Sequence, residues 1–320
     1  MDIQRSIRAV ADAADAPSGI VDWASVAEAA KGTCEPGALR LSEAERAGFR
    51  DDVRAARDGL REASGVEFDL PGSVEVQSRH HWIDANVDTF RRVMRPLEAQ
   101  GPGAFPGFAR SVNTGTMAVT LGFLARNVLG QYDPLLLADA ESHEHGLYFV
   151  RPNIRRVAVE LNVDYPRFRR WIAFHEVAHA AEFGAAPWLP GYLEARTEGG
   201  IDALMEGRLD RDAFAELNVA MTAVEGYAEL LMDRAFDDEY ADLRAKLDAR
   251  RGGGDPLTRL FKRLLGFGMK RRQYERGADF FEAVVDRRDL ATASLVWEEA
   301  ANLPTDEELD DPGRWIRRVA

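Results

Sequence analysis

The stretch WIAFHEVAHAAEF occupies residues 171–183 and contains two of the chain's six histidines, four positions apart, with a glutamate directly after the first. It predicts a helix, because Asp164 can cap the N-terminus and Pro166 fits the first turn. At 100° per residue, one stripe of this helix collects Phe168, Trp171, Ile172, His175, Ala178 and His179. Both imidazoles are therefore expected to point into the protein.

The spacing of His175 and His179 places one ring above the other on a single helix face. Two ring nitrogens can then converge on one ion, about 2.0–2.1 Å from each. Glu176 lies about 100° further around the helix, where its carboxylate can reach a water molecule beside that ion. The motif H-E-x-x-H works in this way: the two histidines bind zinc and the glutamate acts as a general base. The alternative is a pair of core histidines bonded to backbone carbonyls.

A catalytic zinc ion takes a third protein ligand and keeps one position open for water. The candidate segment is AVEGYAELLMD, residues 223–233. Glu225 is expected beside its apolar stripe, which is formed by Leu217, Met221, Val224, Ala228, Leu231 and Ala235. Gly226 would permit close approach of a neighbouring element. We predict Glu225 as the ligand and Glu229, further out, as a partner that orients a histidine N–H. Two alternatives remain. Glu225 and Glu229 could have the opposite roles, or both could lie on a solvated, acidic edge of the helix without binding a metal.

Other candidate side chains have weaker patterns. The remaining histidines favour surface positions: His80 and His81 before Trp82, and His143 and His145 in an acidic segment. Residues 131–133, with the sequence QYD, could line a site or build a turn before Pro134. Tyr227 and Tyr274 could donate a hydrogen bond to an oxyanion, and for both the alternative is packing.

Composition limits the classes of partner. No apolar run approaches the roughly 20 residues of a membrane span. The net charge of −13 disfavours nucleic acid and anionic membranes as partners. The first residues, MDIQRSIRAVADAADAP, lack the uninterrupted apolar core of a secretory signal and carry acids, so we expect a cytoplasmic protein. The single cysteine, Cys34, excludes an intramolecular disulfide and a cysteine-cluster metal site. The acidic, lysine-poor composition suits a high-salt cytoplasm, or else reflects a GC-rich genome.

Helical periodicity dominates the chain, and the first 65 residues already contain amphipathic helical patterns. Two segments resemble strands, SVEVQSR at 73–79 and GLYFVRPN at 146–153. We therefore predict an α+β, predominantly helical fold with a small β-sheet. No break forces a division, so we expect a single domain over 1–320, with a helical N-terminal portion at 1–65 and a core and helical C-terminal portion at 66–320.

HEVAH followed by EGYAE resembles the gluzincin metallopeptidases, whose third zinc ligand is a glutamate on a second helix. More closely, the chain is similar to a zincin-like family of actinobacterial, chloroflexal and archaeal proteins called zinc-dependent metalloproteases or "coenzyme F420 biosynthesis associated". The matching runs cover nearly the whole chain: VDW, WIDANVDTF, LGFLARNVLGQYDP, RPNI, HEVAHAAEFGAAPWLPGYL, EGYAELLMD, LLGFGMKRRQYERG and VWEEAANLPTDEELDDPGRW.

The resemblance implies a zincin-like fold, with an active-site helix against a small sheet and additional helices. It also implies Zn²⁺ held by His175, His179 and Glu225, with Glu176 as general base in hydrolysis of a peptide or amide bond. Tyr227 stands where the family leads us to expect histidine, and its hydroxyl could take the oxyanion-binding role. Two alternatives remain: a non-catalytic zinc-binding structural or regulatory protein, and an amide hydrolase acting on a small molecule.

Overall fold

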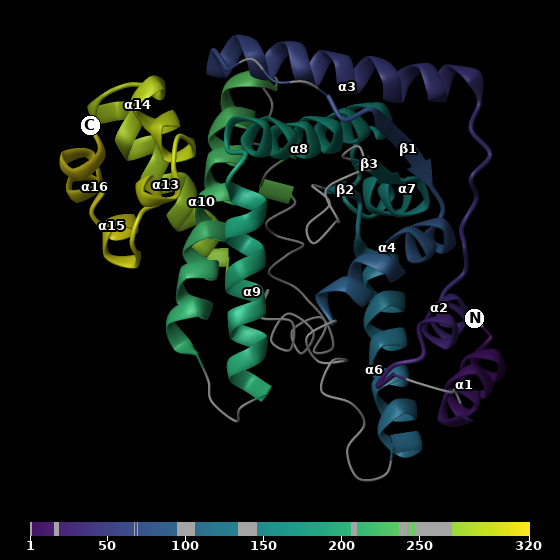
Figure 1. Cartoon of the computed structure of the whole chain (residues 1–320). Coiled ribbons are helices and arrows are strands. Elements are labelled where there is room, and N and C mark those ends of the chain that lie inside the picture. Colours follow the sequence, from purple (N-terminus) through teal and green to yellow (C-terminus); the bar gives the residue numbers. More distant parts are fainter. Residues whose placement is uncertain are drawn as a thin grey trace. The chain divides into compact units, whose positions relative to one another are not determined.

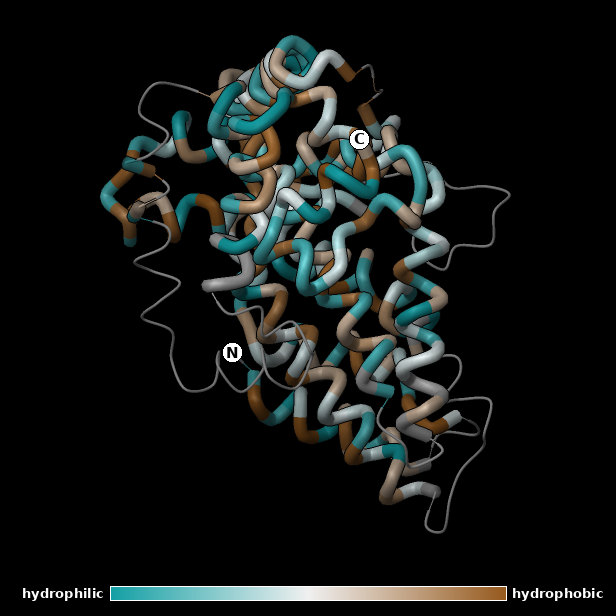
Figure 2. Tube along the Cα trace, turned by 90° about the vertical axis from the view of Figure 1, so that its left-hand side faces the viewer, coloured by the Kyte–Doolittle hydropathy of each residue, from teal (hydrophilic) through white to brown (hydrophobic). Residues whose placement is uncertain are grey.

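The computed structural model describes residues 2–15, 19–66, 68, 70–94, 106–133, 146–205, 210–236, 242–243, 245–246 and 271–320. Hydrophobic and hydrophilic residues are interleaved along its helices (Figure 2). Among these residues, no helix has the length and apolar character that a membrane crossing requires.

The chain forms two compact units, each assembled from three segments. Unit 1 comprises Met1–Arg40, Ser73–Arg156 and Thr197–Asp210. Unit 2 comprises Leu41–Gly72, Val157–Arg196 and Arg211–Ala320. The expectation of one domain over residues 1–320 stays a prediction.

Unit 1 contains a three-stranded sheet and several helices (Figure 1). The elements are α1 (Ile3–Asp12), η1 (Ala13–Asp15), α2 (Trp23–Gly32), β1 (Ser73–Gln77), α4 (Arg79–Val93), α6 (Pro106–Asn127), β2 (Gly130–Asp133) and β3 (Gly146–Val150). The strand order is β1-β3-β2, with β1 parallel to β3 and β2 antiparallel to it. Both expected strands are confirmed, and β2 is a third strand that was not expected from the sequence.

The position of β2 is supported by side-chain hydrogen bonds to α4. The indole of Trp82 donates to Oε1 of Gln131 at 2.6 Å, and the Gln131 amide donates to Oδ1 of Asn86 at 2.9 Å. Gln131 thus links a strand to a helix instead of building a turn. Trp82 belongs to the apolar core of unit 1, with Val21, Trp23, Val26, Ala29, Ala30, Cys34, Ile83, Ala118, Leu121, Ala125 and Val150.

The secondary-structure elements of unit 2 within its described residues are all helices. Its elements are α3 (Glu43–Ser64), α8 (Tyr165–Ala185), α10 (Arg211–Ala235), α13 (Arg271–Arg287), α14 (Leu290–Ser294), η2 (Leu295–Trp297), η3 (Ala300–Asn302), α15 (Asp306–Asp310) and α16 (Pro312–Val319). Two further helices contribute residues to both units, α7 (Arg151–Glu160) and α9 (Leu189–Met205). The predicted α+β, predominantly helical fold is confirmed.

Helix α8 begins as its sequence predicts. The Asp164 carboxylate accepts a hydrogen bond from the backbone N–H of Arg167 at 2.9 Å, and Pro166 occupies the first turn. The apolar members of the predicted stripe are buried, and His175 and His179 are partly buried. Residues on other faces are buried as well, including Ala173, Phe174 and Val177. The helix is therefore more deeply buried than a single stripe implies. It runs alongside α3 and also packs against α10 (Figure 1).

A buried ion pair joins α3 to α8. The guanidinium of Arg169 donates from Nε to Oδ2 of Asp52 at 2.6 Å, and the two side chains are only 9% and 13% exposed. Gly48 leaves the space that Arg169 fills, since a Cβ there would lie 2.3 Å from a guanidinium nitrogen. Burial raises the pKa of Asp52 in spite of the hydrogen bond and charge of Arg169. Such a pair is costly to break from one side only.

Replacing one member of this pair should therefore destabilise unit 2. Asp52→Ala leaves the Arg169 charge buried, and we expect a loss of about 3–5 kcal/mol in the free energy of unfolding. Urea denaturation followed by circular dichroism measures it. The matched control is Glu43→Gln, which removes the exposed pair with Arg50 and should cost about 0–1 kcal/mol. Equal midpoints for both variants would contradict this account.

Helices α10 and α13 approach closely through two glycines. A Cβ on Gly226 would lie 2.3 Å from the carbonyl carbon of Gly277, and one on Gly277 would lie 2.3 Å from the carbonyl oxygen of Thr222. No side chain fits at such a contact without backbone movement. The close approach expected at Gly226 is thus confirmed, and the neighbour is α13.

We expect Gly226→Ala to destabilise the protein, although alanine is the better helix former. The clash should cost about 1–3 kcal/mol or more, which exceeds the roughly 1 kcal/mol gained in helix propensity. Gly199→Ala in α9 is the control, because a Cβ there meets nothing within 4 Å. That variant should unfold at the same or a higher temperature. Thermal denaturation of the two variants measures both effects. A Gly226→Ala variant that is more stable than the wild type would refute the close packing of α10 against α13.

Candidate metal centre

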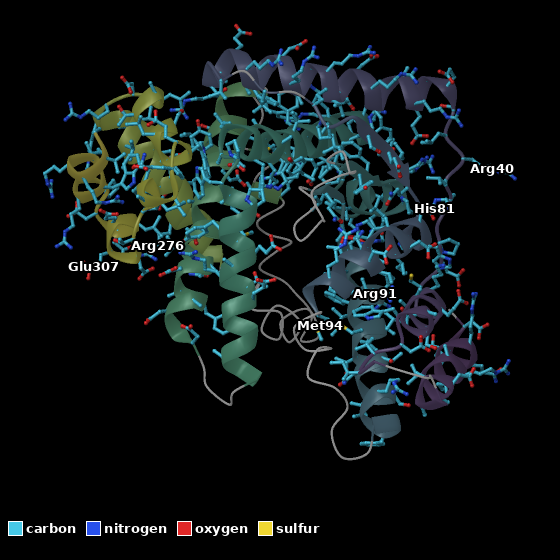
Figure 3. All side chains as sticks on the ribbon, in the orientation of Figure 1. Arg40, His81, Arg91, Met94, Arg276 and Glu307 are labelled. Atoms are coloured by element: carbon cyan, nitrogen blue, oxygen red, sulfur yellow. The ribbon has the colours of Figure 1, made fainter. Side chains whose placement is uncertain are left out.

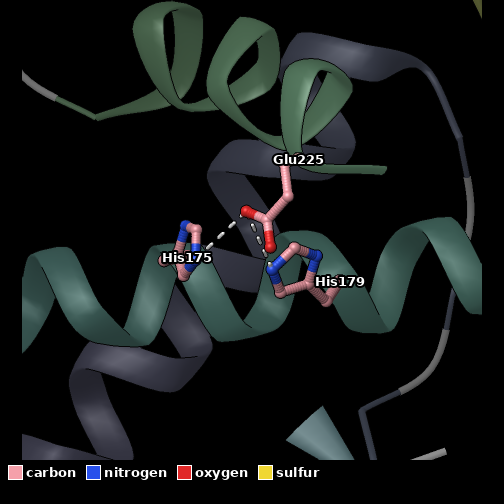
Figure 4. Close-up of side chains that lie close together, drawn as sticks. All are labelled: His175, His179 and Glu225. Atoms are coloured by element: carbon pink, nitrogen blue, oxygen red, sulfur yellow. Dashed lines mark ion pairs between the residues drawn. The ribbon is translucent and has the colours of Figure 1, made fainter. Parts of the chain in front are cut away.

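Two imidazoles of α8 face one carboxylate of α10 (Figure 4). Nε2 of His175 and Nε2 of His179 each lie 4.0 Å from Oε2 of Glu225. Potential ligand atoms of the three side chains all lie within 4.8 Å of one another. Within the described part of the chain, this is the one group of three or more His, Cys, Asp or Glu side chains close enough to hold a metal ion.

An aromatic stack fixes the ring of His175. The indole of Trp171, one turn earlier on α8, stacks on the imidazole with ring centroids 5.6 Å apart and planes 8° from parallel. Phe168 also stacks with Trp171, with centroids 6.0 Å apart and planes at 3°. Phe168 and Trp171 are buried, so the surrounding core restricts rotation of the His175 ring.

A hydrogen bond holds the ring of His179. Its Nδ1 lies 2.9 Å from Oε2 of Glu182, and the Glu182 side chain is fully buried. Glu182 was not among the site residues expected from the sequence. The signal was available, because Glu182 follows His179 by three positions and so lies on the same helix face.

Three buried carboxylates lie on the two helices that carry the centre, and burial raises the pKa of one of them, Glu182, to about 7 against the hydrogen bond and charge of His179. Glu176 and Glu229 are 7% and 4% exposed, and Glu182 is 1% exposed. Burial alone would lower the pKa of His179. The hydrogen bond to Glu182 and the charges of Glu182, Glu225 and Glu176 outweigh burial and raise that pKa. The same carboxylates would favour a cation at Nε2 of His179 only in exchange for a proton, because an imidazole that binds a metal is neutral.

The surroundings of Glu229 and Tyr227 differ from those expected from the sequence. Glu229 is buried and not further out than Glu225, whose side chain is 15% exposed. The side chain that hydrogen-bonds Nδ1 of His179 is Glu182, and an orienting role for Glu229 stays a prediction. The hydroxyl of Tyr227 lies 2.7 Å from Oγ of Ser294, and its ring packs edge-on against Phe281 and Trp297.

Burial raises the pKa of Tyr227 to about 12, against the opposing effect of its hydrogen bond with Ser294. This placement in an aromatic cluster favours the packing alternative for Tyr227, and its catalytic role stays a prediction. The remaining candidate residues are not part of the group formed by His175, His179 and Glu225 within the described residues. Nε2 of His80 lies 2.9 Å from the carbonyl oxygen of Cys34, and His81 is exposed (Figure 3). His143, His145 and the side chains of Asp133 and Tyr274 lie outside the described residues.

The donor set fits a zinc ion. Two imidazole nitrogens and one carboxylate oxygen are ordinary zinc ligands, and three protein donors leave a fourth position open, as in catalytic sites. Donors on one tetrahedral zinc ion are separated by about 3.4 Å. The observed 4.0 Å separations to Glu225 are thus wider by about half an ångström, a difference that small side-chain rotations can close.

Comparison with known proteins agrees with this geometry. The family model of the zincin-like metallopeptidases matches residues 21–207 and 200–316. A crystal structure titled as a "putative hydrolase with a novel fold" from Chloroflexus aurantiacus superimposes with a TM-score of 0.78 at 30% sequence identity. The match covers 93% of this chain and 98% of that one. No curated protein matches the sequence. The chain belongs to the zincin-like metallopeptidase family.

Proposed function

We propose that the protein is a zinc-dependent hydrolase of peptide or amide bonds. The observation that carries the proposal is the convergence of His175, His179 and Glu225, with potential ligand atoms within 4.8 Å of one another. His175 and His179 would each offer Nε2, and Glu225 a carboxylate oxygen. Membership of a metallopeptidase family supports a hydrolytic reaction and a peptide as substrate.

Glu176 is the residue to which we assign proton transfer. Zinc bound in such a site would act as a Lewis acid, lowering the pKa of its water toward about 7 and polarising a carbonyl group. The Glu176 carboxylate would take a proton from the attacking water and pass it to the leaving amine nitrogen, so that it ends the reaction ionised again. Its position directly after His175 and its burial, at 7% exposed, suit a base that is shielded from bulk solvent.

The alternative of a non-catalytic zinc protein has less support. A structural zinc site commonly has four protein ligands and needs no general base. Here three donors converge and an acid side chain follows the first histidine. A small-molecule amide would use the same donors and the same base, so the residues named above serve that alternative equally.

Two substitutions separate metal binding from proton transfer. His179→Ala should lose bound zinc, since it removes one of three donors. Glu176→Gln should retain about one zinc per chain but lose about 10²- to 10⁴-fold in hydrolysis, the usual contribution of a general base. Metal content by mass spectrometry and cleavage of a mixed peptide library measure the two effects. A Glu176→Gln variant as active as the wild type would refute the assignment of the base.

A second pair of variants tests the choice of carboxylate. Glu225→Gln should weaken zinc binding by more than about 100-fold, because a ligand is lost, whereas Glu229→Gln should weaken it by less. Chelator competition on the metal-free protein gives both dissociation constants. The reverse order would exchange the roles of the two glutamates.

A further inference from the structure

Glu182 is a buried carboxylate that the proposed reaction does not use. Its side chain has no solvent exposure, and Oε2 lies 2.9 Å from Nδ1 of His179. Oε1 is also buried and has no hydrogen-bond partner among the described atoms. A carboxylate satisfied on one oxygen only is costly in a protein interior. An apolar side chain would serve the packing of α8 better, so the position requires another explanation.

The hydrogen bond determines which nitrogen of His179 carries the proton. A cation bound at Nε2 of His179 leaves the ring proton on Nδ1, and Oε2 of Glu182, 2.9 Å away, is placed to accept it. When the imidazole is neutral, the lone pair is then on Nε2. That nitrogen is the one that lies 4.0 Å from Glu225. Glu182 therefore selects the tautomer of His179 that can bind a cation beside Glu225.

The two imidazoles are held in different ways. His175 stacks on Trp171, which restrains the ring plane. No aromatic stack of this kind is seen for His179 within the described residues; its ring meets His175 edge-on, with planes 76° apart. The hydrogen bond to Glu182 is the directional contact that orients it. Loss of that bond would free the ring to rotate and would permit the other tautomer.

We propose that Glu182 is the positioning residue of this centre, fixing the tautomer and orientation of His179 from within α8. The inference rests on the proposed zinc site. It assigns to Glu182 the role that the sequence led us to expect of Glu229. Carboxylate partners of this kind typically contribute 10- to 100-fold to metal affinity.

The test compares zinc affinity and stability in matched variants. Glu182→Met removes the acceptor at similar volume, and Glu182→Gln keeps a neutral acceptor. We expect the zinc dissociation constant of the first to rise 10- to 100-fold and that of the second to rise less. The metal-free Glu182→Met protein should melt below the wild type, because Nδ1 of His179 loses its buried acceptor, so the melting temperature reports the loss of stability separately from zinc affinity. Chelator competition with Zn²⁺ and thermal denaturation provide the two measurements.

The control is Glu308→Gln, which changes another buried carboxylate of unit 2 that accepts hydrogen bonds from the Arg318 guanidinium and the backbone N–H of Thr305. It should lower the melting temperature and leave zinc affinity unchanged. An unchanged dissociation constant for Glu182→Met, with zinc still bound by the wild type, would overturn this inference alone. A larger loss of zinc affinity in Glu229→Met than in Glu182→Met would also overturn this inference. A wild-type protein that takes up no zinc would overturn the proposed function as well.

Discussion

The constraint on which unit 2 depends is the burial of a helix that carries charged and polar side chains. Helix α8 is covered by α3 and α10, yet it contains Arg169, two imidazoles and two buried glutamates. Each of these groups is costly in the interior unless it has a partner. Asp52 on α3 pairs with Arg169, and Glu225 on α10 faces the imidazoles. The partners of α8 thus come from the helices that pack on it.

Close helix packing positions the carboxylate side of the centre. Gly226 lets the backbone of α10 approach that of α13, and the neighbouring residue Glu225 points to α8. Tyr227, one position further on, lies instead in the aromatic cluster with Phe281 and Trp297. Three consecutive residues of one helix therefore serve three functions: a potential ligand, a close backbone contact and an apolar core contact. The 100° step between helical residues makes this possible.

Several features could not be predicted from local sequence. Strand β2 has only four residues, and its pairing with β3 and its hydrogen bonds to α4 decide its conformation more than its composition does. The burial of Glu229 was underestimated, because a wheel drawn for one helix describes a single buried face. Helix α10 packs on α3, α8 and α13, so several of its faces are covered.

The sequence alone determined the helical character, two of the three strands, the cap of α8 and the pairing of His175 with His179 on one face. Each of these depends on residues within a few positions of one another, so spacing and capping rules suffice. The tertiary structure decided that Glu225 faces those histidines, that Glu182 bonds His179 and that Tyr227 packs against Phe281 and Trp297. The first and last depend on how two helices far apart in the chain are packed. The second depends on side-chain rotamers that the surrounding core selects.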